Sequence, residues 1–185
     1  PKEIATTDDA RPNIAIRNLN GSQFANFYIA GTADGTHVKF GIHKDAPANG
    51  VFADAEYNFN TTYLIVIRYD VANGETSGDY DDKMYLWINP SLASEPSVSS
   101  AQVAIDNFWD FNFDGGFNTA AQSLQIFQEF KSATASFDAF RVAYGQGYET
   151  DLVNSSAAWN ALTPIGEPLP VKLDNLKGFA KNKGI

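Results

Sequence analysis

Two dense apolar runs, at residues 63–70 and 84–89, constrain the fold of this chain more than any other feature. Side chains alternate between the two faces of an extended strand, and both runs carry apolar residues on both faces. The first run places Tyr63, Ile65, Ile67 and Tyr69 on one face and Leu64 and Val66 on the other. The second places Met84, Leu86 and Ile88 on one face and Tyr85 and Trp87 on the other, until Asn89-Pro90 ends it. We therefore expect a central antiparallel hairpin covered on both sides, which requires two sheets or one sheet folded over itself.

Strand-like runs recur along the rest of the chain, separated by turn signals. The predicted strands cover residues 13–17, 24–30, 36–43, 51–59, 63–70, 84–89, 101–113, 123–130 and 137–144. The dipeptides between them that accept a positive φ are Asn20-Gly21, Asp34-Gly35, Asn49-Gly50 and Asn73-Gly74. This spacing predicts an all-β protein, an antiparallel two-sheet sandwich of the jelly-roll type. Only residues 150–162 have a helical composition, and they predict one short helix.

The composition changes sharply at residue 163. The stretch TPIGEPLP, residues 163–170, contains three prolines in eight positions and predicts an extended linker after a sandwich domain in residues 1–162. Residues 1–170 carry 21 acidic and 9 basic side chains, a net charge of −12, whereas residues 171–185 carry 4 basic and 1 acidic, a net charge of +3. We interpret residues 171–185 either as an edge strand or as the start of a following module.

The overall composition excludes several classes of protein. The 185 residues contain no cysteine, so neither a disulfide scaffold nor a thiolate metal site can form. No apolar run approaches the roughly 20 residues that span a bilayer, and the acidic body disfavours nucleic acid as a partner. Abundant Asn, Ser, Thr and Gly with 14% aromatic residues favour an extracellular β protein.

Four segments carry a family resemblance: TTYLIVIRYD, KMYLWINP, SFDAFRVAYG and PLPVKLDNLKGFAKNKG. In this order they resemble a concanavalin A-like, laminin G-like domain of large secreted proteins from Bacteroidetes-type bacteria. The resemblance extends roughly from Phe24 to Lys183. It implies a cell-surface or secreted location, with a segment like LPVKL leading to a type IX secretion sorting domain. In that family the sandwich begins with strands upstream of those found here, so we expect a fragment of a longer protein.

The resemblance also brings in an enzymatic alternative, because the same fold hosts glycoside hydrolases that use two carboxylates. Their laminarinase-like motif is E-x-D-x-x-E, and the nearest match here is ETDLVN, with Glu149, Asp151 and Asn154. An amide at Asn154 replaces one essential carboxylate, and Asp151 is better explained as a residue at the start of a helix. We therefore predict no catalytic residues. The alternative that remains is a polysaccharide-cleaving hydrolase using Glu149 and Asp151.

The stretch DFNFDGG, residues 110–116, matches the first half of a calcium-binding loop. The candidate ligands are Asp110, Asn112 and Asp114, but Ala121 stands where the loop needs a bidentate Glu. If the segment is extended, the three side chains stand about 6.6 Å apart and cannot converge on one ion. Calcium is therefore a candidate cofactor only if these residues form a loop.

Other polar residues are better explained as surface positions. Asp79, Asp81 and Asp82 lie in the long hairpin loop, where we expect them in water; ligation of an ion by these three residues is the weaker alternative. His37 and His43 share the polar phase of the strand THVKFGIH, and we expect both at the surface.

Tryptophan could provide a stacking platform for sugar rings. Trp87 and Trp109 occur in the apolar phase of their runs, so packing explains both better; Trp159 is the least constrained of the three.

The sequence thus predicts a non-catalytic extracellular module of a larger surface or secreted protein. Its expected role is adhesion, glycan binding or structural spacing. The expected partners are other domains of the same protein and glycans or other cell-surface proteins. The sugar-binding residues are not identifiable from the sequence.

Overall fold

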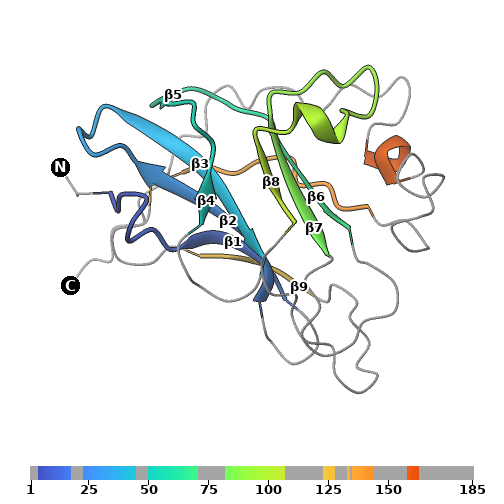
Figure 1. Cartoon of the computed structure of the whole chain (residues 1–185), viewed down its shortest axis with the longest axis horizontal. Helices are drawn as coiled ribbons and strands as arrows, with labels where there is room; N and C mark the ends of the chain where they lie inside the picture. Colours follow the sequence, from blue (N-terminus) through green and yellow to red (C-terminus); the bar gives the residue numbers. More distant parts are fainter. Residues whose placement is uncertain are drawn as a thin grey trace, which may run out of the picture.

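Two antiparallel sheets pack face to face in the computed structural model (Figure 1). The structure describes residues 4–17, 23–44, 50–70, 82–106, 123–127, 133, 135–143 and 158–162. The large sheet has the strand order β4-β3-β2-β1-β9, and β5 also pairs with β3. Its strands are β1 (Pro12–Arg17), β2 (Gln23–Gly31), β3 (His37–Lys44), β4 (Val51–Phe52), β5 (Tyr57–Asn58) and β9 (Ser123–Ile126). The small sheet has the order β6-β7-β8, with β6 (Ile65–Asp70), β7 (Lys83–Ile88) and β8 (Val103–Ile105). The all-β prediction is confirmed, while the jelly-roll arrangement stays a prediction.

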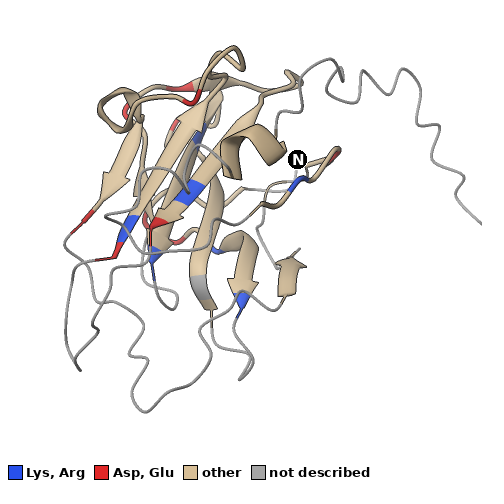
Figure 2. Cartoon of the chain, turned by 90° about the vertical axis from the view of Figure 1, so that its right-hand side faces the viewer, with Lys and Arg blue, Asp and Glu red and all other residues tan. Residues whose placement is uncertain are grey.

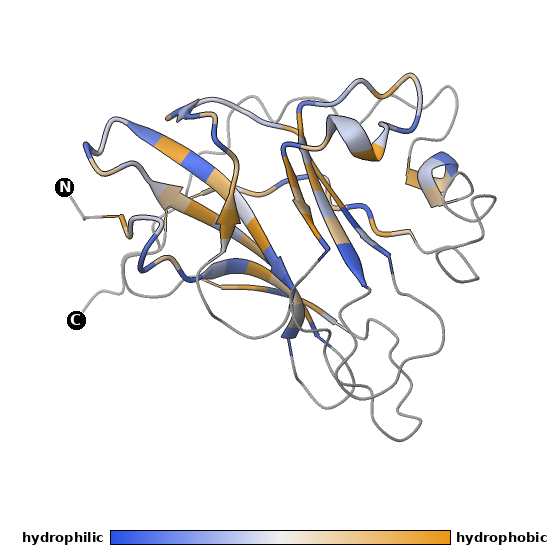
Figure 3. Cartoon of the chain, in the orientation of Figure 1, coloured by the Kyte–Doolittle hydropathy of each residue, from blue (hydrophilic) through white to orange (hydrophobic). Residues whose placement is uncertain are grey.

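The core lies between the two sheets and follows the alternation of the sequence (Figure 3). Strands β2 and β3 contribute Ala25, Phe27, Ile29, Val38, Phe40 and Ile42. Strands β7 and β8 contribute Met84, Leu86, Ile88, Val103 and Ile105. Because the sheets bury these faces against each other, residues with the opposite phase lie on the outer faces of the sandwich.

The predicted hairpin forms, with β6 and β7 antiparallel from the pair Ile65 and Ile88 to the pair Asp70 and Lys83. Strand β7 is central, but β6 lies at the edge of the small sheet as far as the described residues go. Every residue of β6 is half-buried, so the expectation that this strand is buried on both sides was wrong. Its inner side chains pack on the core, and its outer face includes the charged residue Arg68.

Several predicted strands are shorter than the sequence pattern suggested. The run at 51–59 divides into β4 and β5: the Ala53 N–H still bonds to the Phe40 carbonyl at 2.9 Å, and the chain then bends through exposed residues 54–56. Strand β5 pairs with β3 in a different register from β4. Residues 137–143, predicted as a strand, are not extended in a ladder, and Ala139 has a φ of 56°. Residues 107–113 and 128–130 of two further predictions lie outside the described residues.

The remaining expectations concern turns, the helix and the C-terminal part. Gly35 has a φ of 69° in the turn between β2 and β3, as Asp34-Gly35 predicted. Residues 158–162 are helical, which confirms a short helix within the predicted range. Residues 163–185, which include the predicted linker, lie outside the described residues. Among the residues that are described, no helix is long and apolar enough to cross a membrane.

Candidate functional site

The loop of residues 89–102 lies at one end of the small sheet (Figure 1) and packs over Trp87 on its outer face. The loop begins where β7 stops, at Asn89, which has a left-handed φ of 52°, and Pro90. Two hydrogen bonds join Asn89 to Leu64: the Asn89 N–H donates to the Leu64 carbonyl at 2.8 Å, and Asn89 Oδ1 accepts from the Leu64 N–H at 2.7 Å. A short 3-10 turn, η1 (Val98–Ser100), then leads the chain back to β8.

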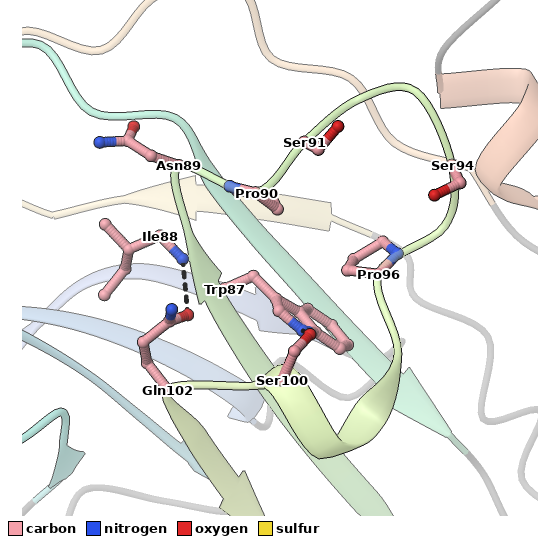
Figure 4. A pocket seen from close by; sticks show the side chains of 9 residues that line it. All are labelled: Trp87, Ile88, Asn89, Pro90, Ser91, Ser94, Pro96, Ser100 and Gln102. Atoms are coloured by element: carbon pink, nitrogen blue, oxygen red, sulfur yellow. Dashed lines mark hydrogen bonds between the residues drawn. The ribbon is translucent and has the colours of Figure 1, made fainter.

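A hollow of about 270 Å³ lies between this loop and the end of β7 (Figure 4). Its lining is uncharged and consists of hydroxyl, amide, proline and apolar side chains: Trp87, Ile88, Asn89, Pro90, Ser91, Ser94, Pro96, Ser100 and Gln102. The volume is slightly below the about 300–1,000 Å³ that is typical of small-molecule sites. The hollow therefore suits one small group rather than a large ligand.

Trp87 forms the inner wall of the hollow. Its indole is 2% exposed and donates from Nε1 to the Ser97 carbonyl and to Ser100 Oγ, each at 3.2 Å. The Tyr85 ring lies beside it, with the ring centroids 5.8 Å apart. The expectation that Trp87 serves packing is confirmed, because so little of the ring is open to a stacking sugar.

Several polar groups of the hollow still have bonding capacity. Gln102 uses Oε1 to accept from the Ile88 N–H at 3.0 Å, which leaves its amide NH₂ as a donor (Figure 4). Ser91 Oγ accepts from the Ala93 N–H at 3.3 Å and retains its own O–H donor. Ser94 Oγ makes no hydrogen bond with any residue that the structure describes. A ligand with both donors and acceptors would match this set.

An ion-pair network attaches the middle of the loop to the sheet. Arg68 on β6 donates from Nε to Asp70 Oδ1 at 2.5 Å and from Nη1 to Glu95 Oε1 at 2.9 Å. Although burial lowers the pKa of the guanidinium, the Asp70 hydrogen bond and the charges of Asp70 and Glu95 raise the pKa of Arg68 above its ordinary value. Glu95 stands between Ser94 and Pro96, two residues that line the hollow.

A second polar cluster lies between the sheets, at the ends of β3 and β7. Lys44 and Asp82 are fully buried, and Lys44 Nζ donates to the Asp82 carbonyl. Tyr69 donates from its hydroxyl to Asp82 Oδ2 at 2.6 Å. Asp82 was expected in water, so that prediction was wrong: residue 82 has the inward phase of β7 and already belongs to the core.

The two histidines differ from each other. His37 is partly exposed, with Nδ1 2.8 Å from Thr36 Oγ1 and 3.7 Å from Glu56 Oε2. His43 is 4% exposed, which contradicts the prediction of a surface position. His43 does point to the outer face of β3, as the alternation predicted. Its cross-strand neighbour Asn26 is also fully buried, so this part of the outer face is shielded from solvent.

The turn between β2 and β3 contains a third group of polar side chains. Asp34 accepts from Thr32 Oγ1 at 2.6 Å, from the Thr36 N–H at 3.1 Å and from Thr36 Oγ1 at 2.8 Å. The Thr32 hydrogen bond and those from Thr36 lower the pKa of Asp34 to about 2. These bonds close the turn, so we assign Asp34 a structural role.

Most of the residues that the sequence suggested for catalysis, metal binding or sugar stacking lie outside the described residues. These are the hydrolase candidates Glu149, Asp151 and Asn154, the calcium candidates Asp110, Asn112 and Asp114, and also Asp79, Asp81 and Trp109. Trp159 is 8% exposed and therefore packs in the interior. Within the described ranges no three His, Asp or Glu side chains could hold a metal ion, and Figure 2 shows the acidic residues dispersed.

The hollow was not predicted from the sequence. The available signal was the stretch SLASEPSVSS, residues 91–100, which is rich in serine and follows a doubly apolar strand directly. Serine and proline at such a position also suit an ordinary loop. Only the folding of this loop over Trp87 distinguishes a lined hollow from a simple connection.

Comparison with known proteins yields no matching family model, no similar curated protein and no similar solved structure.

Proposed function

We propose that this domain is a non-catalytic, extracellular glycan-binding module of a larger surface or secreted protein. The observation that carries the proposal is the uncharged lining of the hollow beneath the loop of residues 89–102. Hydroxyl and amide groups there alternate with proline and aliphatic walls. Such a surface fits a sugar unit, whose hydroxyl groups both donate and accept while its C–H face packs on apolar atoms.

The extracellular location and the membership in a larger protein rest on composition and on the resemblance to concanavalin A-like domains of secreted proteins. Two features of the fold are consistent with a binding role. The sandwich provides a rigid support, because β7 is anchored in the core by Met84, Leu86 and Ile88. The hollow lies on a loop over this support, which is where binding residues commonly occur.

A glycan array tests the proposal directly. We expect the full chain to bind a subset of immobilised glycans, and Ser94→Trp to abolish binding by filling the hollow. Ser99→Trp is the matched control: Ser99 is exposed in the same loop but does not line the hollow, so this variant should bind normally. Failure of the wild-type chain to bind any glycan would overturn the proposed function.

Two further experiments test for hydrolase activity and for calcium binding. A reducing-sugar assay on laminarin, agar and alginate should show no turnover by the wild-type chain. Turnover that is lost in Glu149→Gln would establish the hydrolase instead.

Thermal melting with added calcium and with EDTA tests Asp110, Asn112 and Asp114 as ligands, because an ion that binds the folded state raises the melting temperature. Equal melting temperatures would remove these three residues as ligands.

A further inference from the structure

We infer that the hollow selects uncharged sugar units and that the ion pair of Arg68 with Glu95 positions its wall. This inference rests on the proposed function and adds the ligand class and a residue pair that does not itself line the hollow.

The geometry makes Glu95 the attachment point of one wall. Ser94 and Pro96 line the hollow, and Glu95, the residue between them, bonds to Arg68 at 2.9 Å. Further along the loop, the Ser97 carbonyl and Ser100 Oγ accept hydrogen bonds from the Trp87 indole. The loop is thus held to the small sheet at two points, and the ion pair is the point beside Ser94.

The surroundings of the pair make it stronger than an ordinary surface ion pair. The side chains of Arg68 and Glu95 are 25% and 24% exposed, and Asp70, which holds the guanidinium from the other side, is 12% exposed. Networks and good geometry distinguish ion pairs that matter from those that contribute little. Because the pair remains partly open to solvent, salt should still weaken it.

The charge distribution gives the ligand class. None of the residues that line the hollow is charged, so an anionic or cationic sugar would lose water without gaining a counter-charge there. The network that holds the wall combines the Arg68 guanidinium with the carboxylates of Asp70 and Glu95, so its net charge is −1, and residues 1–170 carry a net charge of −12. Uronic acids and sulfated sugars would therefore be repelled, whereas neutral hexoses and their N-acetyl derivatives would not.

The first test needs no ligand. Amide hydrogen exchange of Glu95→Gln should be faster than that of the wild type in residues 90–100, while exchange in β2 and β3 and the melting temperature stay unchanged. Glu56→Gln is the matched control, because Glu56 forms the partly exposed pair with His37 in the large sheet. Unchanged exchange in residues 90–100 of Glu95→Gln would overturn the positioning role, whatever the glycan array shows.

The second test measures binding to the neutral glycans found on the array. We expect Glu95→Gln to bind about tenfold more weakly, since the wall is no longer held in place, and Glu56→Gln to bind like the wild type.

Salt provides a second measurement, because 1 M NaCl weakens the ion pair. The affinity of the wild type for a neutral sugar should fall in 1 M NaCl, and the affinity of Glu95→Gln should not. Preferential binding of uronates or sulfated glycans would overturn the ligand class while leaving glycan binding intact. An array on which no glycan binds would overturn the proposed function and the ligand class together, and the hydrogen-exchange test of Glu95→Gln would still decide the positioning role.

Discussion

At the scale of single residues, Trp87 joins the strand to the loop that covers it. The ring fills the space between the small sheet and residues 89–102, and its N–H satisfies two acceptors of the loop. We expect Trp87→Ala to lower the free energy of unfolding by about 3–5 kcal/mol, because it leaves a cavity that the loop cannot fill. Trp87→Phe, which keeps much of the volume, should cost clearly less. Urea denaturation measures both, and a loss below about 1 kcal/mol for the alanine variant would contradict this packing role.

Asp34 gives the fold a predictable response to acid. Its pKa of about 2 in the folded chain lies below its ordinary value of 3.8, so its contribution to stability is complete above pH 4 and is lost as the pH falls through 2. The side chain is exposed, and the effect is accordingly small. Melting temperatures measured between pH 5 and pH 2 should fall less steeply in Asp34→Asn than in the wild type. Parallel curves would show that the three hydrogen bonds do not favour the charged form.

The alternation of side chains along a strand could not by itself predict which polar residues are buried. Alternation correctly placed His43 on the outer face of β3, but whether an outer face meets water depends on chain that packs over it. Asp82 was assigned to the loop because its neighbours are acidic, although its position two residues before Met84 already gives it the inward phase. Both errors have the same cause. The sequence pattern specifies which face of the sheet each side chain points to, but not whether another part of the chain packs over that face.

At the scale of elements, the strands predicted best are those with strong patterns on both sides of a turn. The hairpin of β6 and β7 and the pairing of β2 with β3 at Asp34-Gly35 were predictable because apolar runs and turn residues agree. The break between β4 and β5 was not, since it is a change of register in the pairing with β3, a strand that is distant in sequence. The hollow was unpredictable for the same reason: its two sides meet only through tertiary packing.

The pairing of β3 with β4 depends on a glycine. A Cβ atom at Gly41 would lie 2.7 Å from Phe52 Cδ1 and 2.8 Å from the Val51 carbonyl, so the backbone of β4 would have to move. We expect Gly41→Ala to destabilise the protein by about 1–3 kcal/mol. Gly31→Ala is the matched control in the same sheet, since its Cβ would meet Ile4 at an ordinary 3.5 Å. Equal melting temperatures for the two variants would show that β4 is not required to pack this closely.

At the scale of the whole molecule, the proline-rich stretch at residues 163–170 predicts the end of the sandwich domain. The reversal of charge at the same boundary supports the reading of residues 171–185 as the start of another module. A chain that ends at Pro170 should therefore melt cooperatively, at nearly the temperature of the full chain. Loss of cooperative melting would identify residues 171–185 as an edge strand of the sandwich instead.

The contact between Lys44 and Asp82 has a consequence for the fidelity of folding. A slip of β3 by one residue would exchange the faces of His43 and Lys44 and withdraw the ammonium group from the Asp82 carbonyl. A β3 strand that is shifted by one residue thus loses a buried hydrogen bond as well as apolar contacts. The free energy of the shifted state is therefore higher than that of the native state. We expect Lys44→Met to refold into more than one register, visible as duplicated amide resonances along β3. A single set of resonances would mean that the apolar residues of β3 are sufficient to select its alignment.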